Sequence, residues 1–331
     1  MPSGVGMTPR ERVRAALRGG EVDRVPVAFW GHFASDPRTA EEITAETVRF
    51  QRRFDWDFVK LMPSGMYFPQ ALGCELTPAS GPGGTNQIAR SVVRSAEDWR
   101  RLPEPPPTEG WLGEHVASVA RIRRELGPDV PIVQTLFSPL TVAHKLAGAD
   151  FQRYVREERE TLEEGLERLT AASIAFARAT LDAGADGFFY ATQEATLDEL
   201  SEPEFERLGK AYDRRVLDGL DERAWFKLLH VCRESIMAEA VADYPVEAIN
   251  WDANRNFPSL AEAPGIWPQA LVGGLDRQGA ILSGTPSEVE REVRAAVEAL
   301  GGRHLIVSAG CALPLARPDA NLDAARRAVA R

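Results

Sequence analysis

Short apolar runs alternate with longer amphipathic segments along most of the chain. Eight runs have the length and composition of buried β-strands, at residues 25–30, 57–62, 131–136, 187–191, 226–232, 248–251, 270–275 and 304–308. Helical periodicity marks stretches between most of them, at residues 39–53, 114–126, 160–183, 202–217 and 287–300. A further helix is expected to begin near Thr8 and end at Gly19, because Thr8 and Glu11 form a capping box and Pro9 suits the first turn.

Eight strand-like runs separated by helices predict an α/β fold, the (β/α)₈ TIM barrel. A doubly wound open sheet is the alternative, but it requires a glycine-rich phosphate turn after an early strand, and the sequence has none there. We expect a single domain over residues 1–331. Residues 63–107 are rich in Gly and Pro and predict a small hairpin-bearing insertion after the second strand, which serves as an insertion or lid.

Composition narrows the classes of function. The net charge is −10 and the pI is about 5.2, which argues against non-specific binding of nucleic acid. The sequence lacks an apolar run of about 18 residues, so no membrane span is predicted. Residues 1–7 lack the apolar core of a secretory signal, and three cysteines are too few and odd in number for a disulfide framework. We therefore expect a cytoplasmic protein with free or metal-bound thiols.

Two of the three cysteines lie at the ends of strand-like runs. His230 and Cys232 are two residues apart, so they point to the same side of an extended strand, and Cys311 follows the last run. One imidazole and two thiolates give three protein ligands for zinc and leave a position for substrate. The alternative is that each is a buried apolar or hydrogen-bonded side chain, which is the expectation for Cys74.

Other polar residues also follow predicted strands. We expect Glu194 to be a fourth, displaceable zinc ligand, and Asp252 and Asp276 to be catalytic groups, unless these two are helix caps or ion-pair partners.

Trp30, His32 and Gln193 are candidates for binding a cofactor at the mouth of the barrel, with core or loop packing as the alternative. Asp186 begins a strand, so we expect it at the opposite, stabilising end.

A zinc ion with two thiolate ligands retains little positive charge. It is a poor generator of hydroxide, but it deprotonates an added thiol that binds to it. The chemistry predicted for such a site is alkyl transfer to sulfur, such as transfer of a methyl group.

The sequence also resembles the uroporphyrinogen decarboxylase superfamily over nearly its whole length. The segments that carry the resemblance are Arg10–Gly19, Asp23–Pro26, Ser138–Ala143, Leu146–Gly148, Gly184–Asp186, Leu229–Cys232, Gly273–Asp276, Ser283–Thr285, Gly310–Cys311 and Asn321–Leu322. The resemblance implies a (β/α)₈ barrel.

Two branches of this superfamily carry different sequence motifs. The decarboxylases carry Arg-Gln-Ala-Gly-Arg after the first strand and a His after the last. Here those places read Trp30-Gly-His-Phe-Ala-Ser35 and Gly310-Cys-Ala312, which counts against decarboxylation of a porphyrinogen.

The other branch resembles methylcobalamin:thiol methyltransferases, such as the coenzyme M enzymes, which bind zinc through His-x-Cys and a distant Cys. His230, Cys232 and Cys311 match that pattern.

The second resemblance implies transfer of a methyl group from methylcobalamin to a small thiol. The sequence shows no Asp-x-His-x-x-Gly cobalamin motif, so we expect the corrinoid to arrive on a partner protein or free in solution. The family also implies a possible homodimer. The alternatives are a decarboxylase-like carboxy-lyase acting on a tetrapyrrole or another carboxylate-rich substrate, and a non-catalytic protein that binds zinc or a corrinoid.

Overall fold

The centre of the molecule is a curled parallel sheet. The computed structural model describes residues 6–77 and 86–330. Within those residues, seven strands form one sheet in the order β1-β4-β5-β6-β7-β8-β9, and each pairs in parallel with the next. They are β1 (Val59–Lys60), β4 (Ile132–Phe137), β5 (Gly187–Thr192), β6 (Phe226–Val231), β7 (Ala248–Asn250), β8 (Ala270–Leu275) and β9 (Leu305–Ala309).

Residues 25–31 lie where the sequence predicts the first strand. Val27 forms a parallel bridge with Val307 of β9, and the Asp57 N–H donates to the Val27 carbonyl at 3.0 Å. The segment therefore joins β9 to the residues that lead into β1. It is an isolated bridge and not the continuous strand expected for residues 25–30, in part because Pro26 has no N–H to donate to a ladder. The predicted barrel class is confirmed.

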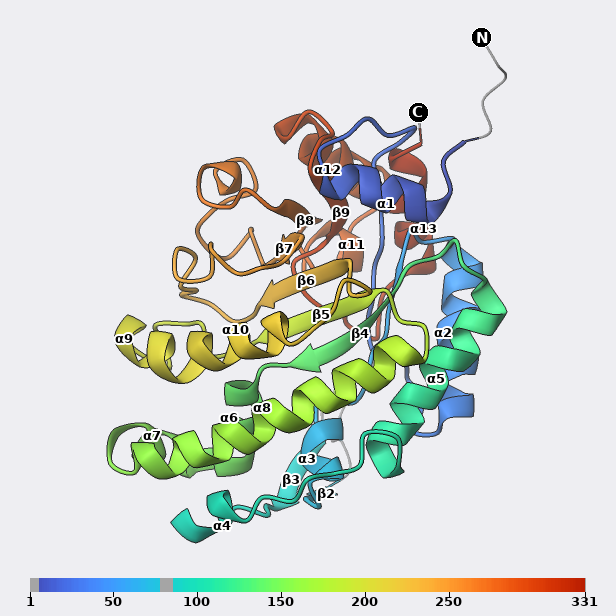
Figure 1. Cartoon of the computed structure of the whole chain (residues 1–331). Coiled ribbons are helices and arrows are strands. Elements are labelled where there is room, and N and C mark those ends of the chain that lie inside the picture. The colour runs from blue at the N-terminus through green and yellow to red at the C-terminus, as the bar shows by residue number, and fades with distance from the viewer. Residues whose placement is uncertain (1–5, 78–85, 331) are drawn as a thin grey trace.

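Helices cover the outer surface of the sheet (Figure 1). The longer ones are α1 (Pro9–Leu17), α2 (Ala40–Phe54), α5 (Gly110–Leu126), α6 (Pro139–Ala147), α8 (Arg159–Asp182), α10 (Ala211–Asp218), α12 (Pro286–Ala299) and α13 (Asp319–Ala328). The shorter ones are α3 (Tyr67–Ala71), α4 (Ala96–Arg100), α7 (Phe151–Arg156), α9 (Glu202–Phe205) and α11 (Ala280–Ser283), with 3₁₀ turns at Gly148–Asp150 and Ala263–Gly265. Alternation of these helices with fully buried strands explains why the strand sequences read as continuous apolar runs.

Local sequence signals set where several helices begin and end. The capping box of Thr8 and Glu11 is present, so the predicted N-terminal helix is confirmed. Thr39 caps α2 and Thr285 caps α12 in the same way. The predicted helix at residues 202–217 is instead divided into α9, a π-helical turn at Glu206–Lys210, and α10.

The segment between β1 and α5 contains α3, a two-stranded antiparallel sheet and α4. The two strands are β2 (Glu75–Thr77) and β3 (Gln87–Arg90). Trp99 of α4 is fully buried, and its ring packs edge-on against Tyr154 of α7 at 5.4 Å. Part of the predicted insertion, residues 78–85, lies outside the described residues. Its role as an insertion or lid stays a prediction.

None of the helices in the described ranges combines the length and the apolar character needed to cross a bilayer.

Candidate metal centre

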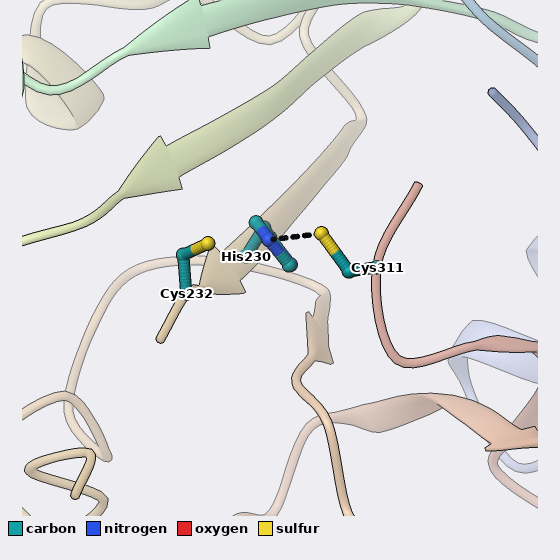
Figure 2. Close-up of side chains that lie close together, drawn as sticks. All are labelled: His230, Cys232 and Cys311. Carbon is teal, nitrogen blue, oxygen red and sulfur yellow. Dashed lines mark hydrogen bonds between the residues drawn. The ribbon is translucent and has the colours of Figure 1, made fainter. Parts of the chain in front are cut away.

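Three predicted ligands converge at the carboxyl end of the barrel. His230 and Cys232 come from the end of β6, and Cys311 follows β9 (Figure 2). One ligand atom from each lies within 4.8 Å of the other two, and Cys311 Sγ is 3.6 Å from His230 Nε2. The imidazole is buried, and both cysteines are partly buried. The structure therefore brings together residues that are far apart in the sequence.

The backbone explains how β6 and β9 present these side chains. The Cys232 N–H donates to the Thr192 carbonyl at 3.1 Å, so Cys232 keeps the strand register one residue beyond β6. Gly310 passes so close to Asp252 that a Cβ on Gly310 would lie 2.5 Å from the Asp252 Cα. A glycine at this position is thus required to bring Cys311 against the end of β6.

Asn250 determines which nitrogen of His230 is free. Its side-chain N–H groups donate to the carbonyls of Val272 and Ala309, at 2.7 and 3.1 Å. The amide oxygen therefore faces His230 Nδ1, at 2.7 Å, and must accept a hydrogen bond from it. With the proton on Nδ1, the lone pair of Nε2 points to the side of Cys311. This is the arrangement of a histidine that ligates a metal.

The two thiols influence each other strongly. The neighbouring Cys232 thiol lowers the pKa of Cys311 well below its usual value. Interaction with the neighbouring Cys311, together with burial, raises the pKa of Cys232. One sulfur therefore holds a negative charge more readily than the other. A cation between them would satisfy both as thiolates.

The donor set and spacing fit zinc. Zinc takes thiolate sulfur and imidazole nitrogen at about 2.0–2.3 Å in a tetrahedron, which places neighbouring ligand atoms about 3.5 Å apart. The 3.6 Å separation of Cys311 Sγ and His230 Nε2 matches that edge. Three protein ligands leave one tetrahedral position for another molecule.

A polar cavity of about 350 Å³ opens onto the three ligands. Its wall is formed by Asp198, His230, Val231, Cys232, Arg233, Glu234, Asp252, Arg255, Asn256, Arg277, Gln278, Gly310 and Cys311. Arg277 is notable among them, because its Nε is buried and has no hydrogen-bond partner within the described residues. The nearest ion-pair contact of Arg277 is 3.9 Å, to Asp252.

Comparisons of the sequence with known proteins agree on one family. The family model for uroporphyrinogen decarboxylase (URO-D) matches residues 8–331. The chain belongs to the uroporphyrinogen decarboxylase family. Its relatives include the methylcobamide:CoM methyltransferase MtbA of Methanosarcina mazei, 23% identical over 96% of both chains. They also include the uroporphyrinogen decarboxylase of Pseudoalteromonas translucida, 27% identical over 90% of this chain and 84% of the relative.

A solved structure has the same fold as this family member. The structure of a methyltransferase from Methanosarcina mazei aligns with a TM-score of 0.86 at 22% identity, covering 97% of this chain and 98% of that one. The agreement supports the uroporphyrinogen decarboxylase-type barrel along the whole described chain.

Glu194 lies near the metal centre of this family member but outside the group of three ligand atoms. The carboxylate is almost fully buried, and it accepts a hydrogen bond from Thr141 and lies 3.1 Å from His144 Nδ1. Arg233 is 3.8 Å away. The carboxylate is therefore already held by other side chains. A role for Glu194 as a fourth ligand stays a prediction.

Asp252 and Asp276 occupy different environments. Asp252 lines the cavity, and burial raises its pKa. Asp276 accepts a hydrogen bond from the Gln278 N–H at 2.9 Å, which stabilises a turn, and it is not among the residues of the cavity wall. The structure thus places Asp252 within reach of a bound molecule and Asp276 in a local turn. Their catalytic roles stay predictions.

The predicted cofactor-binding residues do not share one surface. Trp30 is buried and packs edge-on against Phe189, with ring centroids 5.3 Å apart. His32 is partly buried, and its pKa is lowered by burial first and by Lys60 second. The Gln193 N–H donates to Thr141 Oγ1 at 3.0 Å. None of the three lines the described wall of the metal cavity. Their role in binding a cofactor stays a prediction.

The candidate residues predicted from the sequence did not include Asn250, Arg277 or Lys60. Asn250 was detectable, since it ends a strand one place along the sheet from His230 and has the same register. Arg277 follows Asp276 directly after β8, so its place at a strand end was a second signal. Lys60 is a charged residue inside an apolar strand, which is itself unusual.

Proposed function

We propose that this protein is a zinc-dependent methyltransferase that moves a methyl group from a corrinoid to a small thiol. The observation that carries the proposal is the group of His230, Cys232 and Cys311, in which Asn250 directs the free nitrogen of His230 toward a sulfur. The relative named methylcobamide:CoM methyltransferase supports the same chemistry. The 23% identity to that relative leaves the acceptor thiol undefined.

His230 Nε2 and the sulfurs of Cys232 and Cys311 would hold the zinc. Bound there, zinc would favour the deprotonated form of a thiol and so provide a strong nucleophile near neutral pH. Asn250 keeps the His230 tautomer fixed through its bonds to Val272 and Ala309. The sulfur nucleophile would then attack the methyl carbon, leaving the electron pair of the carbon–cobalt bond on the corrinoid.

The cavity sets the size of the acceptor. A volume of about 350 Å³ accommodates a small thiol, whereas a corrin macrocycle must present its methyl group from the mouth. We propose that methylcobalamin is delivered on a separate corrinoid protein or free in solution. Trp30, His32 and Gln193 remain our candidates for corrinoid contacts.

A carboxy-lyase acting on a carboxylate-rich substrate is the second candidate. Arg233, Arg255 and Arg277 line the cavity and suit the binding of carboxylates. The 27% identical relative is named uroporphyrinogen decarboxylase. The paired sulfurs beside His230 favour the methyltransferase, because decarboxylation has no evident need of them.

The first experiment is metal analysis of the native protein and of Cys232→Ser, purified under reducing conditions without chelator. We expect roughly one zinc per native chain and loss of most of it in the variant. The zinc-loaded protein should then demethylate methylcobalamin in the presence of 2-mercaptoethanesulfonate. Cys74→Ser is the matched control, because Cys74 is a buried cysteine outside the ligand group.

Native protein without zinc, or zinc retained fully by Cys232→Ser, would refute the metal site. Release of carbon dioxide from uroporphyrinogen would then favour the carboxy-lyase.

A further inference from the structure

Lysine is rare in this protein, and its positions are informative. Only four of the 39 basic residues are lysines, at positions 60, 145, 210 and 227. Lys210 lies 3.1 Å from Asp243, and Lys227 lies 2.9 Å from Glu247, so both have carboxylate partners. Within the described residues, Lys60 and Lys145 have no carboxylate within ion-pairing distance. Each interacts electrostatically with one cysteine of the candidate metal centre, Lys60 with Cys311 and Lys145 with Cys232.

Lys60 projects from β1 toward the interior of the barrel. Its Nζ lies 4.4 Å from the centroid of the Phe189 ring, and that ring stacks on the His230 imidazole at 4.9 Å. Its one hydrogen-bond contact in the described residues is the sulfur of Met62, at 2.6 Å. Lys60 and the ligand His230 therefore contact the same aromatic ring.

The electrostatic environment of Lys60 connects it to the other side of the metal centre. Burial lowers the pKa of Lys60 to about 7, and the Cys311 sulfur opposes that effect. Lys60 therefore interacts electrostatically with Cys311 and with His32. Even a partly buried ammonium is costly without a carboxylate partner unless another negative charge is supplied.

Lys145 differs in having local compensation. Its Nζ donates to the Gly65 carbonyl at 2.7 Å, and Glu194 and Cys232 both raise its pKa against the larger effect of burial. Lys60 has no hydrogen bond to an oxygen and no buried carboxylate beside it in the described residues. Of the two lysines, Lys60 is therefore the one that lacks a partner for its positive charge within the described residues and is free to interact with a bound anion.

The proposed function supplies that negative charge. Two thiolates and a neutral imidazole cancel the charge of a divalent zinc ion, so a third thiolate would make the site negative. We propose that Lys60 is a positioning residue whose positive charge holds the sulfur of the acceptor in its thiolate form. The inference rests on the proposed thiol acceptor and concerns the sulfur itself, whatever the rest of the acceptor carries.

The choice of lysine over arginine fits this role. An ammonium is a compact point charge, whereas a guanidinium is a planar fork suited to carboxylates and phosphates. Cation–π contact with Phe189 keeps the ammonium in place without neutralising it.

The test compares a thiol with its methylated counterpart. Lys60→Gln and Lys60→Met are purified with zinc, and binding of 2-mercaptoethanol and of 2-(methylthio)ethanol is measured by calorimetry. Both probes are uncharged in solution, so only the bound sulfur of the first can carry a negative charge. We expect zinc content to be unchanged, affinity for 2-mercaptoethanol to fall about tenfold or more, and affinity for the thioether to stay the same. The pH of half-maximal thiol binding should also rise.

Lys227→Gln is the matched control, because it removes a lysine from β6 that is already paired with Glu247. Equal weakening of both probes, or no change in either, would overturn the proposal. So would loss of zinc or of folding in both Lys60 variants, because Lys60 would then serve the ion or the fold. Absence of zinc from the native protein would instead refute the proposed function, which separates the two failures.

Discussion

The two ends of the barrel treat charged side chains in opposite ways. At the amino end, the fully buried Asp57 accepts hydrogen bonds from Arg12 and Arg24, both at 2.6 Å, and from the Val27 N–H at 2.7 Å. At the carboxyl end, Lys60 and Arg277 form no hydrogen bonds to an oxygen within the described chain. The amino-end carboxylate is fully paired, whereas these two cations at the carboxyl end lack such partners.

Asp186 illustrates the stabilising end. It bonds to Arg10 at 2.5 Å, to Arg123, and to the Trp225 indole at 3.0 Å. Its predicted place away from the metal centre is confirmed. The difference between the ends indicates that a cation without a hydrogen bond to an oxygen, at the carboxyl end of this barrel, marks a binding position.

The largest effect on stability is expected from Asp57→Asn. This change leaves the largely buried Arg24 without a counter-charge and Arg12 with Asp23 alone, so the unfolding free energy should fall by about 3–5 kcal/mol. Denaturant unfolding of the metal-free protein measures the change. The exposed pair of Asp36 and Arg38 provides the control, since Asp36→Asn should cost less than about 0.5 kcal/mol. An equal cost for the two variants would break the comparison.

Asn250→Leu should weaken the opposite end. Without the amide, His230 loses the acceptor that holds its proton on Nδ1, and zinc affinity should fall about 10–100-fold. Competition with a chromophoric chelator measures that affinity. Asn256→Ala changes another amide of the cavity wall that bonds to backbone carbonyls only, and it should keep near-native affinity. Unchanged zinc binding in Asn250→Leu would contradict the assigned tautomer.

Arg277→Gln sharpens the distinction between cations at the carboxyl end. The guanidinium faces the cavity with an unpartnered Nε, so affinity for the anionic 2-mercaptoethanesulfonate should fall about tenfold. Affinity for the neutral 2-mercaptoethanol should hold, in contrast to the Lys60 variants. The exposed Arg291 on α12 supplies a control substitution to Gln. A similar loss for both thiols would show that Arg277 acts on the sulfur or the fold instead.

The smallest effect concerns acid stability of the amino end. Hydrogen bonds from Arg12 lower the pKa of Asp23 to about 2. An aspartate with a lowered folded-state pKa contributes stability above its unfolded pKa of about 3.9, and that contribution is lost as pH falls toward 2. Because Asp23 is partly exposed, we expect about 1 kcal/mol. Denaturation at pH values of about 5 and 2.5 should show a shallower pH dependence in Asp23→Asn; equal slopes would contradict it.

Much of the architecture was accessible from the sequence because its signals are local. Apolar runs and capping boxes each depend on a few neighbouring residues, and seven of the eight predicted runs overlap strands of the sheet. The convergence of His230, Cys232 and Cys311 was also accessible, because two residues on one strand share a face and the carboxyl ends of parallel strands meet. The run at residues 25–30 forms only an isolated bridge to Val307, in part because Pro26 has no N–H to donate to a ladder.

The rest of the site depends on partners that no local pattern reveals. Glu194 has the position expected of a ligand, but Thr141 and His144 hold it, and both come from a helix that sequence analysis did not predict. In the sequence, Lys60 is a single charged residue within an apolar strand. Its proposed role could be inferred only from the structure, in which Lys60 and His230 both contact Phe189.

The strand β9 takes part in two closures at once. It presents Cys311 to β6 across the intervening strands β7 and β8, and it also pairs through Val307 with the segment around Val27. An ion held by His230 and Cys311 would therefore link β6 to the end of β9, the strand that also closes the barrel through its bridge to Val27. By reciprocal linkage, removal of the ion should weaken the pairing between β9 and the segment around Val27. Amide hydrogens there, such as that of Ala28, should then exchange faster with solvent. The metal would then stabilise the closed barrel as well as serve as the reaction centre.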